Sequence, residues 1–242
     1  MIELKGKNIV LIEKEEIIQW KKIYNIQNIV DITKTAQIKY QKDNSPIWIC
    51  INIDDVDDIK DLIRKIQKIE KKYQSIKTDE PKMIFEMIGN KKIKIKEDLI
   101  KCMKAIFLTN KREKIEYIYD QVCKDIDEEF EKNNYCDFKN DVCIEKRSGK
   151  CKEKITMGCC HKFTKPFFLG GKLKVCPYLK EKKCSAQCLT CKLFTCDAIQ
   201  RKFKLKEIPL IDCFFNPIQK LIIKSSFFTE REIIIKRLLF FR

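Results

Sequence analysis

Cysteine is the residue type in this chain that could do chemistry. Fourteen of the 242 residues are cysteines, and ten of these fall between residues 136 and 196. A hydrophobic core does not need so many thiols, because Leu or Val fills the same space without the hazard of oxidation. Clustered thiolates are ligands for zinc and for iron–sulfur clusters. The candidate metal ligands are Cys136, Cys143, Cys151, Cys159, Cys160, Cys176, Cys184, Cys188, Cys191 and Cys196.

The expected compartment favours metal over disulfides. The N-terminal segment has no uninterrupted apolar stretch and no small-residue cleavage site, so we expect no secretory signal, and no apolar run approaches the length of a membrane span. We therefore predict a cytoplasmic protein. Reducing conditions there disfavour structural disulfides, and clustered thiols more often hold metal or carry redox chemistry. Disulfides and inert cysteines are the alternatives.

The densest cysteines have ligand spacing. Cys188-x-x-Cys191 is the tight spacing of zinc knuckles and iron–sulfur sites. Together with Cys184 these residues lie at i, i+4 and i+7, which would place them on one face of a helix, so a buried cysteine stripe is the alternative. The same three residues have the spacing of the radical S-adenosylmethionine motif, but only about fifty residues follow them, too few for the barrel of those enzymes.

An adjacent cysteine pair, Cys159 and Cys160, lies upstream. Neighbouring side chains in an extended segment point to opposite sides, so the pair could serve two different sites. His161 follows directly, and we interpret it as a hydrogen-bonded neighbour rather than a ligand. Gly170-Gly171 predicts a hairpin between residues 164–169 and 172–176 that returns Cys176 towards the pair. Eight or more thiols are enough for two four-ligand sites.

This pattern resembles the bacterial zinc- or iron-chelating cysteine-cluster family (YkgJ-type) over residues 159–196. The matching residues are the pair Cys159-Cys160, Cys176-Pro177-Tyr178-Leu179, Cys184, and the ending Cys191-Lys192-Leu193-Phe194-Thr195-Cys196. The resemblance implies a metal or iron–sulfur site without a defined biochemical role, and some relatives are linked to methylation of protein lysines. The family's Tyr-x-x-Arg-Pro element is replaced here by residues 186–190, and the cysteines upstream of the pair are more widely spaced than in the family.

Positive charge is concentrated on and after the cysteines. The net charge is +16; residues 136–196 hold 14 Lys and Arg against 5 Asp and Glu, and residues 201–242 hold 10 against 4. Nearby cations lower thiol pKa values and offset the negative charge of a metal–thiolate group, so we interpret the excess around the cysteines as compensation. A basic surface for nucleic acid or anionic lipid is the alternative.

Residues before the cysteines alternate between strand and helix patterns. We predict an α+β protein: a small mixed α/β N-terminal domain (1–110), followed by an irregular, metal-stapled cysteine-rich domain (111–242) with C-terminal helices. The expected elements are a strand at 8–12, a helix at 13–24, a hairpin of 36–40 with 47–53, a helix at 56–69 capped by Asp54 or Asp55, a hairpin of 83–88 with 91–96 around Gly89-Asn90, and helices at 97–108 and 112–132.

Other residues that invite a functional interpretation have a structural one. Asp54, Asp55, Asp57 and Asp58 could form a carboxylate site, but acidic residues at a helix start more often cap free amides. Cys50, Cys102 and Cys123 lie in apolar or amphipathic segments and are expected as small core residues. The chain has one histidine, no Gly-rich phosphate loop and no nucleophile elbow.

The C-terminal tail mixes basic and aromatic residues. Thr229 and Glu232 have the spacing of a capping box, which predicts a helix over residues 230–241. We expect this tail to pack back onto the cysteine region or the N-terminal domain; a protein partner or a membrane surface are the alternatives.

The sequence thus predicts a cytoplasmic metal-binding protein with a Cys-rich zinc or iron–sulfur site, zinc being preferred. Two alternatives stay open. One is a zinc-stabilised module that binds nucleic acid or a protein partner through the basic C-terminal half. The other is an iron–sulfur-dependent redox or protein-modifying enzyme.

Overall fold

The protein divides into two compact units, Met1–Thr109 and Asn110–Arg242, each with its own buried core. Both contain helices and strands, so the chain is of the mixed α+β class. The computed structural model describes residues 2–3, 9–12, 19, 29–31, 47–73, 83–133, 138–139, 142–143, 161–163, 173–175, 177–180, 183–193 and 208–241. Among the helices in these ranges, none has the length and apolar character needed to cross a bilayer.

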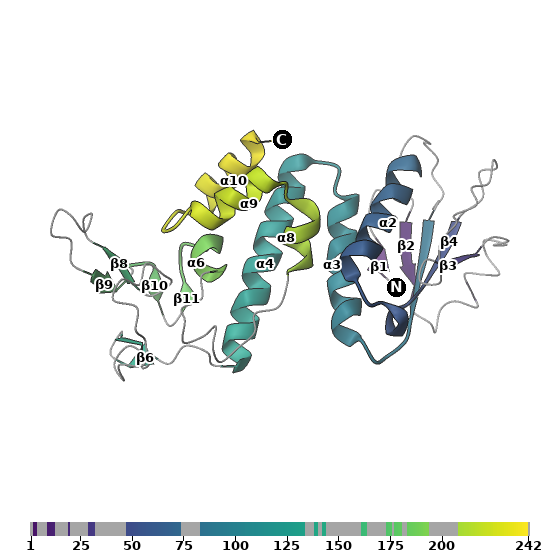
Figure 1. The fold of residues 1–242 in the computed structure, drawn as a ribbon, viewed down its shortest axis with the longest axis horizontal. Helices are drawn as coiled ribbons and strands as arrows, with labels where there is room; N and C mark the ends of the chain where they lie inside the picture. Colours follow the sequence, from purple (N-terminus) through teal and green to yellow (C-terminus); the bar gives the residue numbers. More distant parts are fainter. Residues whose placement is uncertain are drawn as a thin grey trace. The chain divides into compact units, whose positions relative to one another are not determined.

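A five-stranded sheet in the order β1-β2-β5-β4-β3 forms the centre of the first unit (Figure 1). Its strands are β1 (Ile2–Glu3), β2 (Ile9–Ile12), β3 (Ile29–Asp31), β4 (Ile47–Asn52) and β5 (Met83–Ile88). β1 is antiparallel to β2, and the other neighbouring pairs are parallel. Trp48 and Ile49 are both fully buried although they point to opposite faces, as expected for a central strand of a parallel sheet.

Within the described ranges, the long helices α2 (Ile59–Tyr73) and α3 (Ile93–Phe107) accompany this sheet. α2 connects β4 to the adjacent parallel strand β5, and α3 lies beside α2 (Figure 1). Apolar residues at intervals of three and four give α2 a buried face, formed by Leu62, Ile63, Ile66 and Ile69. The helix predicted at 56–69 is therefore confirmed, except that it begins at Ile59.

Both hairpins predicted in this unit are wrong. The two edges of β4 are occupied by the parallel strands β3 and β5, so residues 47–53 are not half of a hairpin; residues 36–40 lie outside the described ranges. Residues 91–96 are not a strand, because α3 begins at Ile93. Alternating apolar residues beside turn residues predict strands, but they do not distinguish a hairpin from parallel strands joined by a crossover.

Gly89 has the backbone conformation of the expected hairpin turn, although the chain continues into a helix. Its φ is +98°, as the expected turn required. A Cβ at this position would lie 2.8 Å from Asp54 Oδ2, and the N–H of Lys91 donates to Asp54 Oδ1 at 2.8 Å. The chain after β5 is thus held against the loop after β4, and it then enters α3.

The aspartates at 54–58 precede α2 as expected, but the residue that caps this helix is not one of the two predicted. Asp54 and Asp55 are in a short 3-10 helix, η2 (Ile53–Asp55), and do not cap α2. Asp58 takes that role, because its Oδ1 accepts the N–H of Lys60 at 2.8 Å. Of the predicted elements further upstream, the strand at 8–12 is confirmed by β2; Gln19 is helical, and the rest of 13–24 lies outside the description.

The second unit is assembled on the long helix α4 (Lys111–Asn133), which confirms the helix predicted at 112–132. Contacts join α4 to α6 (Leu189–Leu193), α8 (Pro209–Phe214) and α10 (Arg231–Phe240), and join α9 (Pro217–Ser225) to α6 and α10 (Figure 1). Its core includes Ile118, Val122, Ile223, Ile234 and Leu238. The expected packing of the tail onto the cysteine region is confirmed by the contact of α9 with α6, and α8 and α10 pack in addition on α4.

Three short antiparallel pairs lie between α4 and α6 in sequence. They are β6 (Phe138–Lys139) with β7 (Val142–Cys143), β8 (His161–Phe163) with β9 (Leu173–Val175), and β10 (Leu179–Lys180) with β11 (Lys183–Cys184). Of the hairpin expected around Gly170-Gly171, the second strand is confirmed by β9, which pairs with β8; residues 164–172 lie outside the described ranges. The ladder pairs His161 with Val175.

The predicted capping box at Thr229 and Glu232 is wrong. α10 begins at Arg231, its N-cap residue is Glu230 without a side-chain cap, and the Thr229 hydroxyl donates to the Phe227 carbonyl at 3.1 Å. A capping box that the sequence analysis missed opens α9 instead. There the Asn216 side chain accepts from the Gln219 N–H at 2.8 Å, and the Gln219 side chain accepts from the Asn216 N–H at 3.1 Å.

Candidate metal centre

Two of the predicted ligands, Cys188 and Cys191, lie together at the start of α6. Both are buried, with exposed fractions of 1% and 3%. Cys188 immediately precedes the helix and Cys191 lies within its single turn, so the x-x spacing brings the two thiols to the same end. The third residue of the expected helical stripe, Cys184, lies in β11, so the prediction that all three share one helix face is wrong.

The turn between α9 and α10, residues 226–229, surrounds these sulfurs with backbone polar groups. The N–H of Phe228 donates to Cys191 Sγ at 3.3 Å. In its protonated form Cys188 donates from Sγ to the Ser226 carbonyl at 3.2 Å. A segment 37 residues away in the sequence therefore completes the environment of the Cys-x-x-Cys pair.

Other contacts of Cys188 favour its thiolate. The hydrogen bond from the Cys191 side chain is the largest cause that lowers the pKa of Cys188, from 9.0 to about 6. Burial acts in the opposite direction, and the N–H groups of Cys191, Thr229 and Phe228 add to the lowering. The Cys188 thiol is thus more acidic than an ordinary cysteine, although it is buried.

Backbone strain occurs on both sides of the pair. Gln187 and Phe228 have φ values of +49° and +53°, and among the described residues they are the only non-glycine residues with positive φ. Such conformations cost free energy and persist where the surrounding structure enforces them, often at functional sites. One of these residues precedes Cys188, and the other supplies the N–H that reaches Cys191.

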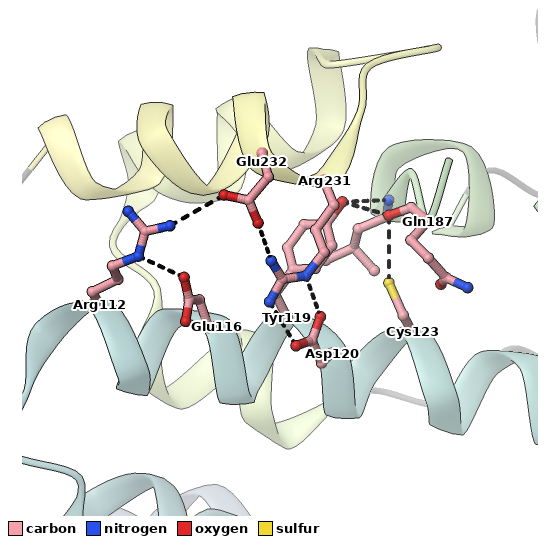
Figure 2. A network of polar contacts seen from close by, with 9 residues as sticks. Arg112, Glu116, Tyr119, Asp120, Cys123, Gln187, Arg231 and Glu232 are labelled. Atoms are coloured by element: carbon pink, nitrogen blue, oxygen red, sulfur yellow. Dashed lines mark hydrogen bonds and ion pairs between the residues drawn. The ribbon is translucent and has the colours of Figure 1, made fainter. Parts of the chain in front are cut away.

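Tyr119 of α4 holds the residues at the start of α6 in place (Figure 2). Its buried hydroxyl donates to the Gln187 carbonyl at 2.7 Å and accepts the N–H of Leu189 at 2.9 Å. Cys123, one helical turn further along α4, points its Sγ to the same carbonyl at 3.8 Å. The two peptide groups that flank Cys188 are therefore anchored to the long helix.

Ion pairs hold α10 on the same helix (Figure 2). The guanidinium of Arg231 forms a bidentate pair with Asp120, with distances of 2.6 and 2.7 Å, and this pairing raises the pKa of Arg231. Arg112 connects Glu116 and Glu232 at 2.7 and 3.1 Å. α10 enters directly from the 226–229 turn, so these contacts also position the turn.

Among the basic residues of 136–196, the side chain of Lys192 is the one that the structure describes. Lys192 is buried and pairs with Asp127 of α4. A hollow of about 360 Å³ next to Cys123 and Gln187 is lined further by Asp120, Lys124, Asp127, Glu128 and Glu131. Hydrogen bonds from Cys191 and from backbone amides, rather than a lysine, lower the pKa of Cys188.

The other predicted ligands are only partly covered by the description. The backbones of Cys143 and Cys184 lie in β7 and β11, whereas Cys136, Cys151, Cys159, Cys160, Cys176 and Cys196 lie outside the described residues. Within the part of the chain that is described, no three Cys, His, Asp or Glu side chains converge as a metal site. The donor set that the structure describes here is two thiols with amide donors directed at them.

The remaining cysteines of the sequence analysis have structural positions. Cys102 and Cys123 are buried, which confirms their prediction as core residues, and Cys50 in β4 is half-buried. The residues that the sequence analysis missed are Tyr119 and the 226–229 turn. The sequence contains no signal for the turn, because it acts through backbone N–H groups, which every residue except proline has.

Comparison with known proteins found no family model, no curated protein and no solved structure that matches this chain. The resemblance to the zinc- or iron-chelating cysteine-cluster family therefore rests on the residues quoted for it and stays a prediction.

Proposed function

We propose that this chain is a metal-binding protein whose cysteine-rich C-terminal unit holds zinc through thiolates, with an iron–sulfur cluster as the competing cofactor. The observation that carries the proposal is the buried Cys188–Cys191 pair with backbone N–H groups directed at its sulfurs. Hydrogen bonds to sulfur are a general feature of metal–thiolate sites, because they offset the charge that the ligands retain.

The remaining ligands of the proposed site come from the cysteines nearest in sequence. Cys184, which ends β11, stands four residues before Cys188, and Cys176 and Cys196 are the next candidates. Cys159 and Cys160 would belong to a second site, to which Cys151, Cys143 and Cys136 are further candidates. A closed set of four thiolates has no open coordination position, so zinc there would stabilise the fold rather than act on a substrate.

Metal content is the first test of this proposal. The full chain is purified anaerobically without added metal, and its zinc, iron and sulfide are measured together with a visible spectrum. We expect a colourless protein with stoichiometric zinc. A brown protein with iron and sulfide would replace zinc by a cluster, and a protein with neither would remove the proposal altogether.

Two serine variants locate the metal. Cys188→Ser and Cys191→Ser are each expected to lose metal to a chelator much faster than the wild type, because each removes one thiolate ligand. Cys213→Ser is the matched control, since Cys213 lies half-buried in α8 of the same unit. Retention of metal by both ligand variants at the wild-type rate would show that the site lies elsewhere.

The alternatives from the sequence remain predictions. The described surface beside the cysteine pair is acidic, which does not favour nucleic acid at this place. A cytoplasmic location, a protein partner for the tail and a redox or protein-modifying activity likewise rest on the sequence alone.

A further inference from the structure

We propose that the 226–229 turn is part of the metal site, with its backbone N–H groups, that of Phe228 above all, hydrogen-bonded to the metal-bound sulfurs. Metal binding is then coupled to the docking of α9 and α10 on α6. This inference rests on the proposed metal-binding function and extends it to a segment that contains no cysteine or histidine.

The geometry for this role is already present. The Phe228 N–H lies 3.3 Å from Cys191 Sγ, and the φ of +53° at Phe228 holds the turn in a conformation that non-glycine residues seldom adopt. Amide groups presented by such a turn form a concave site for negative charge. A thiolate bound to metal keeps lone pairs and excess charge, so it is a suitable acceptor.

Contacts at both ends hold the turn in place. The Ser226 N–H donates to the Ile222 carbonyl at 3.0 Å, which fixes the start of the turn to the end of α9. Arg237 of α10 donates to the Ser226 hydroxyl at 3.3 Å. The amide donors are therefore positioned by both C-terminal helices rather than by the cysteine-rich segment.

Metal binding changes one contact of the turn and strengthens another. A cysteine binds metal as its thiolate, so neither Cys188 nor Cys191 carries a proton when both are ligands. Cys188 then has no proton to donate to the Ser226 carbonyl, and that hydrogen bond is lost. The hydrogen bond from the Phe228 N–H becomes stronger, because its acceptor is now a metal-bound thiolate.

The turn is also linked to the helix that carries the cysteines. Thr190 lies between Cys188 and Cys191, and its hydroxyl donates to the Ile223 carbonyl of α9. Gln219 of α9 in turn donates to the Leu238 carbonyl of α10 at 2.9 Å. A metal that binds only when these elements are docked stabilises the docked arrangement by mass action.

The decisive experiment uses the isotope-labelled full chain loaded with an NMR-active cadmium isotope in place of zinc. A hydrogen bond to a ligating sulfur transmits scalar coupling between the metal and the amide proton. We expect this coupling at the Phe228 amide and none at the Phe227 amide. Cadmium bound through Cys188 and Cys191 without coupling at Phe228 would overturn the inference and leave the metal-binding function intact. Failure of the chain to bind cadmium would remove both.

Two variants and one control measure the contribution of the turn. Phe228→Val places a β-branched residue where φ is +53°, which redirects the N–H, so cadmium affinity should fall about tenfold. Phe228→Gly keeps the N–H and adopts this φ freely, so it should bind like the wild type. Phe227→Val is the control, because it also removes one ring of the Phe227–Phe228 contact.

The cadmium chemical shift separates a positioning role from a loss of folding. It should change in Phe228→Val and remain at the wild-type value in the glycine and control variants. Equal affinity and equal shift in all three variants would contradict a role for the Phe228 amide.

Discussion

At the residue scale, the state of a cysteine follows from what its sulfur contacts. Cys188 is as buried as the core residues Cys102 and Cys123, and at Cys188 a second thiol and several N–H groups lower the pKa of the sulfur. Hydrogen bonds to the charged form outweigh the desolvation that burial imposes. Burial alone therefore does not decide whether a cysteine is a core residue or a ligand.

The lowered pKa of Cys188 predicts how the metal-free protein depends on pH. The pKa of Cys188 is lowered from 9.0 to about 6, so the thiolate should form near pH 6. Because the folded-state pKa lies below the unfolded one, the stabilisation from this group is complete above pH 9 and is lost as the pH falls through 6. The ultraviolet absorbance of thiolates in the wild type minus that in Cys188→Ser should show one transition near pH 6.

The free energy of unfolding should depend on pH in the same way as the titration of Cys188. The advantage of the metal-free wild type over Cys188→Ser in the free energy of unfolding should decrease between pH 9 and pH 6. Cys213→Ser, treated in the same way, should show no such trend. A Cys188 transition near pH 9 would mean that the amide and thiol contacts do not act on this sulfur.

At the element scale, α4 organises the second unit, because α6 and α10 are both attached to it by polar contacts. The contacts to α6 are buried, at Tyr119, whereas those to α10 involve exposed carboxylates: the side chain of Asp120 is 54% exposed. Removing a partner from a buried hydrogen bond leaves an unsatisfied group, whereas an exposed ion pair is screened by solvent. The two attachments therefore differ in strength.

Tyr119→Phe tests the stronger attachment. The change leaves the Gln187 carbonyl and the Leu189 N–H without the hydroxyl that bonds both, so the free energy of unfolding should fall by about 1–3 kcal/mol. Asp120→Asn, at the next position of α4, is the comparison and should cost less than about 1 kcal/mol, decreasing further at high salt. Chemical denaturation followed by circular dichroism measures both. The opposite order would show that α10, not α6, is the more firmly attached helix.

At the scale of the whole molecule, each unit has an apolar core of its own. The first buries Trp48, Phe85 and Ile66 between a parallel sheet and helices, and the proposed metal lies entirely in the second. A core of this size does not need a metal to be stable. The two units should therefore respond differently when metal is removed.

Tryptophan fluorescence makes this difference measurable, because both tryptophans of the chain, Trp20 and Trp48, belong to the first unit. Treatment with a chelator should leave the denaturation midpoint seen by fluorescence unchanged. Hydrogen exchange in α6, α9 and α10 should become faster, and added zinc should reverse it. An equal loss of stability in both units would show that metal supports the whole protein.

Features that depend on the spacing of nearby residues could be predicted from the amino-acid sequence. Residue periods of three and four predicted the helices at 97–108 and 112–132, because a helix repeats its buried face every turn. The x-x spacing of Cys188 and Cys191 likewise identified the pair that the structure brings together. Both signals are contained within one or a few turns of chain.

Which distant groups meet depends on how the whole chain folds. Residues 47–53 carry the same apolar alternation whether their partner is a hairpin strand or the parallel strand β5, so the sequence could not exclude the hairpin. The donors at Cys191 and beside Cys188 are backbone amides and a tyrosine hydroxyl from other elements. A backbone N–H has the same chemistry at nearly every residue, so its role depends on where the folded chain directs it.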